Sequence, residues 1–312
     1  MSDTEPLDGL SVHESADEKV PIESFAAALA ALPVPVEIVG DDAGFDGTDA
    51  VASYRPREGF RDAGWVHCIR AGYDEFGTAA YEAAGTPLTN STGIHATTVG
   101  GLAVGYTVTF ARRLHVYRDK QRRAEWHEPA YDRPFTVEGA SACVVGLGTV
   151  GRGVATRADA LGMDVVGVRR SEESVPGFSA VYHPEELHDA IADARFVVLA
   201  VPETPETAGL ISTPEFRRMR SDAYLINVAR GAVVDEDALV AALDDGVIAG
   251  AGLDVFRTEP LPESSPLWDV EEVLVSPHQG STTNRYPHDL DELTAEIFRR
   301  YRSGEPLRNR VA

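Results

Sequence analysis

Residues 141–171 read SACVVGLGTVGRGVATRADALGMDVVGVRRS, and this stretch decides the fold. Its apolar start at 142–145 predicts a buried strand, which three closely spaced glycines follow. A helical pattern with apolar residues three or four positions apart then runs to Gly162, and residues 163–168 predict a second buried strand. This order of strand, glycine turn, helix and strand is that of one βαβ unit.

The glycines Gly146, Gly148 and Gly151 have the GxGxxG spacing of a dinucleotide-binding turn. The first glycine allows a tight turn, the second lets the backbone approach a pyrophosphate, and the third lets helix and strand pack closely. Phosphate oxygens would then accept hydrogen bonds from N–H groups at the helix N-terminus. A structural turn in an α/β core is the alternative, but the flanking strands and helix are those that the motif requires. We therefore predict dinucleotide binding.

The residues after the second strand favour a phosphorylated dinucleotide. NAD sites usually place an acidic residue here to bind the ribose 2′-hydroxyl, whereas this chain has Arg169, Arg170 and Ser171. Guanidinium groups bind a 2′-phosphate through charge-assisted, bidentate hydrogen bonds. Solvated surface arginines are the alternative. Because an arginine takes the position of the acid itself, we expect NADP(H) as the cofactor, with NAD(H) less favoured.

The charge balance limits the partners. The chain of 312 residues is long enough for two domains, and it carries a net charge of −22 with only two lysines, Lys19 and Lys120. So acidic a surface repels nucleic acids and anionic membranes, and we expect neither as a partner. Acidic, lysine-poor surfaces are typical of proteins from salt-loving organisms, so we expect a halophilic protein. A merely acidic mesophilic protein is the alternative.

The sequence lacks secretory, membrane-spanning and metal-ligand patterns. The N-terminal residues show no secretory pattern, and no apolar run has the length of a membrane span, so we expect a cytoplasmic protein. Cys68 and Cys143 lie in predicted buried strands and lack the spacing of metal ligands. We expect both to be core residues, and we expect no bound metal.

Two α/β domains are predicted from the alternation of strands and helices, which is typical of parallel sheets. Short apolar strands in the first hundred residues cover 10–14, 34–39, 49–53, 65–69 and 87–89. Later strands cover 142–145, 163–168, 196–201, 224–228, 249–255 and 273–276. Six strands form a full Rossmann sheet. We therefore expect two Rossmann-like domains, of which the larger is a six-stranded, parallel, doubly wound cofactor domain.

Two long helical patterns flank this cofactor domain. Residues 97–123 predict one long helix, apolar up to Phe110 and rich in arginine beyond it. We interpret it as an interdomain or dimer element, with an ordinary packed helix as the alternative. Residues 288–302 predict a last helix with one apolar face, which Gly304 ends.

Three polar residues follow predicted strands of the larger domain, where open α/β sheets bind ligands. They are Arg230, Glu259 and His278. Reduction of a ketone by hydride needs a proton donor, and histidine suits that role near neutral pH. A nearby carboxylate would favour the imidazolium, and an arginine would bind a substrate carboxylate. From physical chemistry alone, each of the three could equally be structural.

Five segments of the chain occur together and in this order in one family. They are GLGTVG (146–151), VPETPETAGLI (201–211), LINVARGAVVDEDAL (225–239), GLDVFRTEPLP (252–262) and SPHQG (276–280). Over nearly its whole length the chain resembles the D-isomer-specific 2-hydroxyacid dehydrogenase family. The resemblance implies reversible reduction of a 2-keto acid to a D-2-hydroxy acid, with His278 as general acid/base, Glu259 tuning it and Arg230 binding the carboxylate.

The resemblance also implies the rest of the site. The nucleotide site would comprise Gly146, Leu147, Gly148, Thr149, Val150, Gly151, Arg169, Arg170, Ser171, Val201, Pro202, Thr207, Ala229, Arg230, Asp254, His278 and Gly280. The substrate would contact Ala71, Gly72, Tyr73, Arg230 and His278. Residues 1–98 with 281–312 would form a smaller, flavodoxin-like substrate domain, and residues 99–280 the NADP-binding domain. The family usually forms homodimers, so we expect one here.

Two other functions remain open. A formate or phosphite dehydrogenase shares the fold and the cofactor motifs, but formate enzymes typically pair glutamine with the histidine, and Glu259 argues against them. A dinucleotide-sensing transcriptional corepressor is the non-enzymatic alternative, and the acidic surface argues against it.

Overall fold

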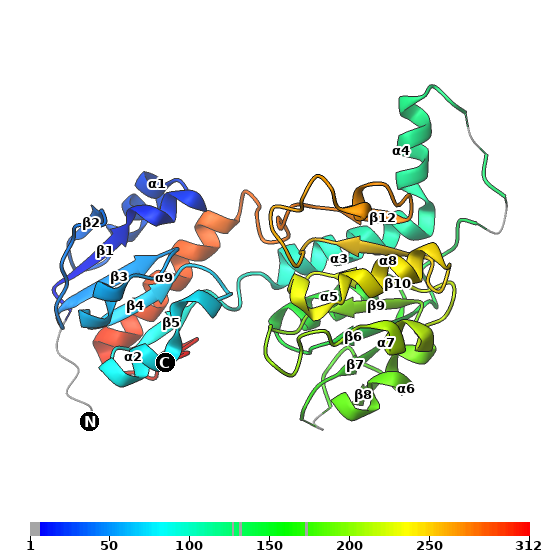
Figure 1. Ribbon diagram of the computed structural model, residues 1–312. Coiled ribbons are helices and arrows are strands. Elements are labelled where there is room, and N and C mark those ends of the chain that lie inside the picture. The colour runs from blue at the N-terminus through cyan, green and yellow to red at the C-terminus, as the bar shows by residue number, and fades with distance from the viewer. Residues whose placement is uncertain (1–6, 127, 131–132, 172–173) are drawn as a thin grey trace. The chain divides into compact units, whose positions relative to one another are not determined.

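The protein is described by a computed structural model that covers residues 7–126, 128–130, 133–171 and 174–312. Contacts within the chain divide it into two compact units, Met1–Ile94 with Thr283–Ala312, and His95–Thr282. Each unit is built on its own sheet (Figure 1). All described strand pairs are parallel in both sheets, as the alternation of strands and helices predicts.

The first unit has a flavodoxin-like sheet. Its strand order is β2-β1-β3-β4-β5, which is the flavodoxin order and confirms that part of the prediction. The strands are β1 (Gly9–His13), β2 (Val36–Val39), β3 (Asp49–Ser53), β4 (Trp65–Cys68) and β5 (Leu88–Asn90). The helices between them are α1 (Ile22–Leu29) and α2 (Thr78–Ala84), with short 3₁₀ turns at Glu14–Glu18, Glu58–Asp62 and Asp74–Phe76.

The last helix of the chain, α9 (Tyr286–Ser303), belongs to this first unit. In Figure 1 it is the orange-red helix beside the blue and cyan strands. Its buried face includes Leu290, Ile297 and Phe298. The ring centroids of Phe298 and Trp65, a residue of β4, lie 6.0 Å apart. Gly304 ends the helix in a left-handed conformation with φ of 69°. The apolar face predicted for this helix therefore completes the core of the first unit.

The second unit has a Rossmann sheet with one strand more than predicted. Its order is β12-β11-β10-β9-β6-β7-β8. The strands are β6 (Ser141–Val145), β7 (Asp164–Val168), β8 (Ala180–Tyr182), β9 (Phe196–Leu199), β10 (Tyr224–Asn227), β11 (Gly250–Leu253) and β12 (Val273–Val275). Six of these were predicted, and the expectation of only six is wrong. The extra strand, β8, is a three-residue edge strand, and it is too short to show a hydrophobic period.

In the part of the second unit that the structure describes, four helices lie between the strands. They are α5 (Thr149–Ala160), α6 (Leu187–Ala192), α7 (Thr213–Arg218) and α8 (Glu236–Asp244), with 3₁₀ turns at Pro184–Glu186, Gly231–Val233 and Pro266–Trp268.

Cys143 of β6 is fully buried, as is Cys68 of the first unit, which confirms both as core residues.

The prediction of one helix over residues 97–123 is wrong. Two helices, α3 (Ala96–Arg112) and α4 (Leu114–Arg122), are separated by Arg113, whose backbone is left-handed with φ of 52°. The break coincides with the end of the buried face, since α3 buries seven residues and α4 buries only Val116. The break carries neither glycine nor proline, so no local sequence signal predicts it.

Helices α3 and α5 cross at two glycines. A Cβ atom on Gly100 would lie 2.7 Å from the Gly153 carbonyl carbon, and a Cβ on Gly153 would lie 2.1 Å from the Ala96 carbonyl oxygen. Both contacts are with backbone, which cannot move aside as a flexible side chain can. The neighbouring Gly101 is exposed, and nothing described lies within 4 Å of its Cβ position. Only one of the two consecutive glycines therefore has a packing role.

This difference predicts opposite effects of two adjacent alanine substitutions. Gly100→Ala should destabilise the protein by about 1–3 kcal/mol, because the methyl group forces the helices apart. Gly101→Ala should stabilise it by up to about 1 kcal/mol, because alanine has the higher helix propensity. Urea unfolding of both variants measures the free energies. Equal effects of the two substitutions would contradict the close crossing.

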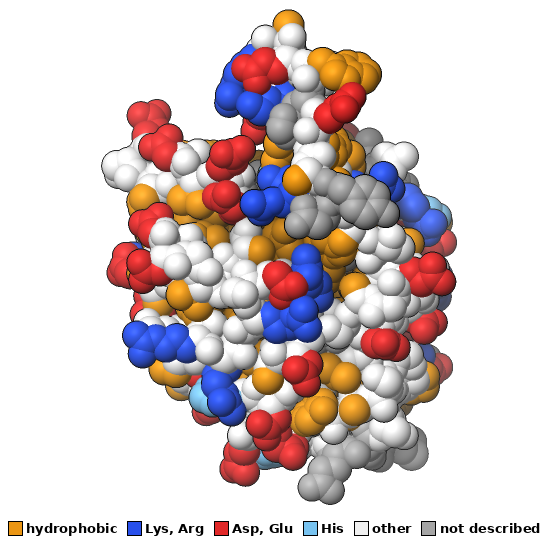
Figure 2. Space-filling view, turned by 90° about the vertical axis from the view of Figure 1, so that its right-hand side faces the viewer, with side chains coloured by type: hydrophobic (Ala, Val, Ile, Leu, Met, Phe, Trp, Pro, Cys, Tyr) orange, Lys and Arg blue, Asp and Glu red, His pale blue; other side chains and the backbone are white. Residues whose placement is uncertain are grey.

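Acidic side chains outnumber basic ones over the whole chain, which has a net charge of −22. On the face drawn in Figure 2, red acidic side chains stand around much of the periphery, and blue cationic side chains form a few separate patches. Among the described residues, no helix has both the length and the apolar composition required to span a membrane.

Candidate active site

The site residues predicted for the second unit follow one edge of its sheet. In a parallel sheet the carboxyl ends of all strands meet at the same edge, where ligands bind. In strand order, this edge carries His278 after β12, Asp254 and Glu259 after β11, Arg230 after β10, residues 201–207 after β9, the glycine turn after β6 and Arg169 after β7. The strand order reverses between β9 and β6, so the glycine turn lies at the switch point.

The three glycines of the turn differ in their steric surroundings. Gly146 has φ of +99°, and a Cβ there would lie 2.6 Å from the Ala200 carbonyl oxygen. A Cβ on Gly151 would lie 1.9 Å from the Gly146 carbonyl oxygen, so helix and turn pack in direct contact. At Gly148 the space is open, since no described atom lies within 4 Å of the Cβ position. The turn is therefore tight at its ends and accessible in the middle.

The helix that follows the turn leaves donors for a ligand. Gly148 is the N-cap of α5 and provides no side-chain hydrogen bond. The N–H groups at the start of a helix have no partners within it, and here they belong to Thr149, Val150 and Gly151. Leu147 is buried and packs where a Cβ on Gly167 would otherwise lie, 2.6 Å from its Cδ2. Open space and uncapped donors fit the pyrophosphate of a dinucleotide.

The loops after β7 and β9 flank this turn. The Arg169 N–H donates to the Tyr182 carbonyl oxygen at 3.0 Å, which fixes the backbone at the end of β7 to β8. Hydrogen bonds to Thr204 and the backbone, with the nearby Arg170 charge, hold the pKa of Glu206 below its usual value. The Thr207 hydroxyl donates to the Pro202 carbonyl oxygen at 2.6 Å and braces the loop after β9.

His278 and Glu259 form a hydrogen-bonded pair. Nδ1 of His278 lies 2.7 Å from Oε2 of Glu259, and Oε1 of Glu259 accepts the Phe256 N–H at 2.9 Å. An ionised carboxylate only accepts hydrogen bonds, so Nδ1 carries a proton and Nε2 is the nitrogen that faces outward from the pair. Burial opposes ionisation of Glu259, but bonds from His278 and Phe256 and the charge of Arg230 outweigh it and lower the pKa of that carboxyl.

A close backbone contact joins the Arg230 loop to the Glu259 loop. A Cβ on Gly231 would lie 1.9 Å from the Phe256 carbonyl carbon, so only glycine allows this approach. The Asn227 side chain stabilises the same loop, since it donates to the Arg230 carbonyl oxygen at 3.0 Å and accepts the Ala229 N–H at 3.0 Å. The sequence predicts Arg230 and Glu259 as site residues, but not the glycine that brings their loops together.

Asp254 holds the turn that carries His278. Its carboxylate accepts the N–H groups of Gln279 and Gly280, each at 2.9 Å, and its main-chain oxygen accepts the His278 N–H at 2.8 Å. His278 itself has a left-handed backbone with φ of 51°, which is costly for a residue other than glycine. These three bonds stabilise that conformation, a contribution the sequence does not predict.

The predicted substrate residues Ala71, Gly72 and Tyr73 belong to the first unit, in the loop after β4. The Ala71 carbonyl oxygen accepts the Asn90 side-chain N–H at 2.6 Å, and the Gly72 carbonyl oxygen accepts the Cys68 thiol at 3.6 Å. The loop carbonyls are thus directed into the unit.

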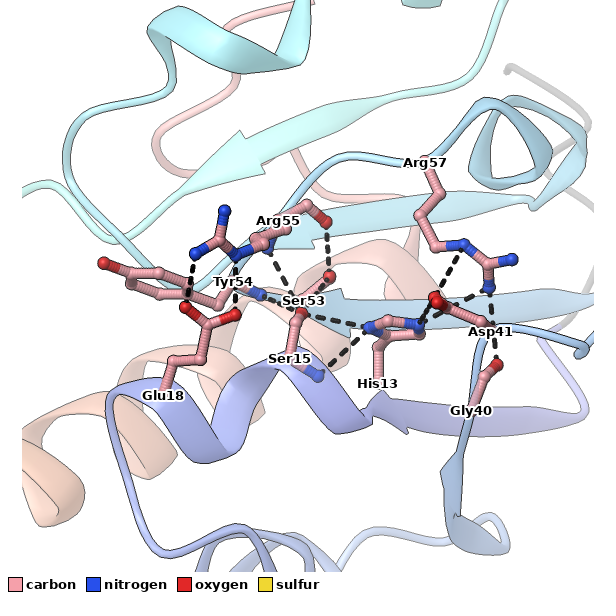
Figure 3. A network of polar contacts seen from close by, with 9 residues as sticks. All are labelled: His13, Ser15, Glu18, Gly40, Asp41, Ser53, Tyr54, Arg55 and Arg57. Carbon is pink, nitrogen blue, oxygen red and sulfur yellow. Dashed lines mark hydrogen bonds and ion pairs between the residues drawn. The ribbon is translucent and has the colours of Figure 1, made fainter.

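The first unit contains a polar network around His13 that the sequence does not predict (Figure 3). The Ser15 N–H donates to Nδ1 of His13 at 3.2 Å, so the ring proton sits on Nε2 and faces Asp41 at 3.2 Å. Glu14 completes a group that could surround a cation, yet the Arg57 guanidinium already lies 3.1 Å from Asp41. Burial and the Arg57 charge lower the pKa of His13. The network ties together the ends of β1, β2 and β3.

The second unit is a dinucleotide-binding Rossmann domain by its strand order and glycine turn. Residues 104–280 match the family model described as "D-isomer specific 2-hydroxyacid dehydrogenase, NAD binding domain". A glyoxylate reductase of Korarchaeum cryptofilum is 34% identical over 75% of this chain and 71% of its own length. A glyoxylate/hydroxypyruvate reductase B of Yersinia pestis is 34% identical over 71% of this chain and 69% of its own.

A solved structure is similar over almost the whole chain. It is a D-isomer specific 2-hydroxyacid dehydrogenase from Xanthobacter autotrophicus Py2 in complex with NADPH and MES. The two chains are 31% identical, each is covered over 98% of its length, and the TM-score is 0.83. The chain therefore belongs to the D-isomer specific 2-hydroxyacid dehydrogenase family, and it is an oxidoreductase with a nicotinamide cofactor.

Proposed function

We propose that this protein reversibly reduces a small 2-keto acid to the D-2-hydroxy acid with NADPH. The observation that carries the proposal is the His278–Glu259 pair, 2.7 Å apart and close to Arg230 at the carboxyl edge of the sheet. The names of the relatives support glyoxylate and hydroxypyruvate as the substrate class. In this proposal residues 99–280 bind the cofactor, and residues 1–98 with 281–312 form the substrate domain of each subunit of a cytoplasmic homodimer.

His278 would move the proton of the reaction. Glu259 accepts from Nδ1, so Nε2 is the ring atom that donates a proton to the developing alkoxide during reduction and takes it back during oxidation. A carboxylate whose pKa is held low stays ionised at neutral pH, so Glu259 keeps accepting from Nδ1 and holds the ring with Nε2 directed away from the pair. The bound nicotinamide supplies the hydride in one direction and accepts it in the other.

Arg230 would bind the substrate carboxylate. Its Nη1 donates to the Ala229 carbonyl oxygen at 2.7 Å, which anchors one edge of the guanidinium, and a guanidinium binds a carboxylate through two parallel hydrogen bonds. Arg230 follows β10, which pairs with β11, the strand before the Glu259 loop, so a carboxylate bound at Arg230 would lie close to the His278–Glu259 pair.

A panel of 2-keto acids tests the proposed function. Glyoxylate, hydroxypyruvate, pyruvate and longer 2-keto acids are incubated with NADPH at molar and at low salt, and NADPH absorbance is followed. Turnover with at least one of them is expected. Tight NADPH binding without turnover of any 2-keto acid would contradict the proposal and favour a dinucleotide sensor.

Arg169 is proposed to select NADPH over NADH. Within the described part of the chain its guanidinium forms no ion pair, and its position after β7 is that of the ribose-binding acid of NAD enzymes. Arg169→Asp should shift the ratio of kcat/KM for NADPH to that for NADH towards NADH by about 10- to 100-fold, since a bidentate contact is lost and a like charge is introduced. Arg217→Asp, an exposed charge change on α7, is the control. A ratio that stays constant in Arg169→Asp would refute the assignment.

A further inference from the structure

A chain of hydrogen bonds runs from α3 to the carboxylate of Asp254. The Tyr106 hydroxyl lies 2.5 Å from Oγ of Ser276 and 3.3 Å from the Leu253 carbonyl oxygen. Oγ of Ser276 donates to Oδ1 of Asp254 at 2.5 Å. Because the single serine proton goes to the carboxylate, Tyr106 is the donor to Ser276. In surroundings of low dielectric constant, each such bond strengthens the next.

This series of hydrogen bonds ends on the backbone of the turn that carries His278. Asp254 accepts the N–H groups of Gln279 and Gly280 with its side chain and that of His278 with its main chain. A Cβ on Gly280 would lie 2.8 Å from Oδ2 of Asp254, so this turn is fitted closely around the carboxylate. A rotation of the Asp254 side chain would therefore shift the backbone at His278.

The ring of Tyr106 is buried against a glycine of β11. Tyr106 is 7% exposed, and it packs over Gly252 of β11, where a Cβ would lie 2.7 Å from the ring. Burial, with the Asp254 charge, raises the pKa of Tyr106 to about 12. The hydroxyl consequently keeps its proton, and remains a donor, throughout the neutral pH range.

We propose that Tyr106 is a positioning residue for the reaction, which acts through Ser276 and Asp254 to hold His278 in its left-handed conformation with the ring on Glu259. Tyr106 positions His278 only through Ser276 and Asp254 and is not itself a catalytic group. The inference rests on the proposed role of His278.

Tyr106→Phe tests this role with a matched control. Phenylalanine keeps the ring and removes the donor. Tyr224→Phe removes a hydroxyl from the same apolar core, where Tyr224 is equally buried and its ring stacks on Phe110 at 4.6 Å. Tyr106→Phe should lower kcat about tenfold while KM for the 2-keto acid and Kd for NADPH change by less than about twofold. Tyr224→Phe should leave kcat unchanged.

A second measurement does not depend on turnover. Amide hydrogen exchange at Gln279 and Gly280 should become faster in Tyr106→Phe and stay unchanged in Tyr224→Phe, because only the first variant loosens Asp254. Ser276→Ala should accelerate the same amides, and adding Tyr106→Phe to it should change neither exchange nor kcat further, since both act along one chain.

The outcomes separate the two proposals. Unchanged kcat and unchanged exchange in Tyr106→Phe would overturn the positioning role. So would a loss of kcat that comes with a lowered Tm and faster exchange throughout α3, which indicates general destabilisation. If the wild type reduces no 2-keto acid, the proposed function fails, and the exchange at Gln279 and Gly280 still decides whether Tyr106 holds the turn.

Discussion

Replacing His278 with alanine should lower kcat for 2-keto acid reduction by about 10²- to 10⁴-fold, the range that a general acid–base group contributes. The variant loses the ring nitrogen that donates the proton, while Arg230 and the glycine turn remain. The His278 side chain is 49% exposed, so its removal leaves no cavity in the core. Tm and the Kd for NADPH should therefore stay close to the wild-type values. Initial rates, thermal unfolding and NADPH titration measure the three quantities.

His188→Ala is the matched control for that substitution. Nε2 of His188 lies 2.8 Å from Oε1 of Glu215, and the His188 side chain is 45% exposed, so this histidine resembles His278 in its own exposure and in its distance to a carboxylate. The two residues belong to α6 and α7 and are not among the predicted site residues. Its loss should not change kcat. Equal losses of kcat in the two variants, or none in His278→Ala, would contradict the role of His278.

The sequence predicts features that short contiguous segments encode. The glycine turn carries its strand, helix and second strand within 31 residues, and Gly146 and Gly151 have steric reasons to be glycine, while the space at Gly148 is open as a bound pyrophosphate would require. Arg230, Glu259 and His278 each follow a recognisable strand. Their proximity, in contrast, depends on β10, β11 and β12 being neighbours in the sheet, which the strand signals alone do not determine.

What the sequence does not predict depends on contacts between distant segments. The Tyr106 hydroxyl meets Leu253 and Ser276 across 147 and 170 residues, and a tyrosine in an apolar helix is indistinguishable from an ordinary core residue. The break at Arg113 is decided by packing, because the residues on either side have good helix propensity. The same holds for Gly231, whose close contact with Phe256 is visible only in three dimensions.

His67 makes the core of the first unit sensitive to acid. It is fully buried in β4, with Nδ1 2.9 Å from Oγ1 of Thr89 and Nε2 3.1 Å from Oγ of Ser91. Burial lowers the pKa of His67 from 6.5 to about 3. Between these two values the unfolded chain binds a proton that the folded protein does not. The contribution of His67 to stability is therefore complete above pH 6.5 and is lost as the pH falls towards 3.

His67→Gln should remove this dependence. The wild-type free energy of unfolding should fall more steeply than that of the variant, by about 1.4 kcal/mol per pH unit between about pH 6 and pH 4. The variant starts lower at neutral pH because it loses a hydrogen bond, so the two curves converge in acid. Urea unfolding at constant ionic strength measures both, and carboxylates shared by the two proteins cancel in the difference. Parallel curves for wild type and His67→Gln would mean that the buried ring takes up its proton without cost to the fold.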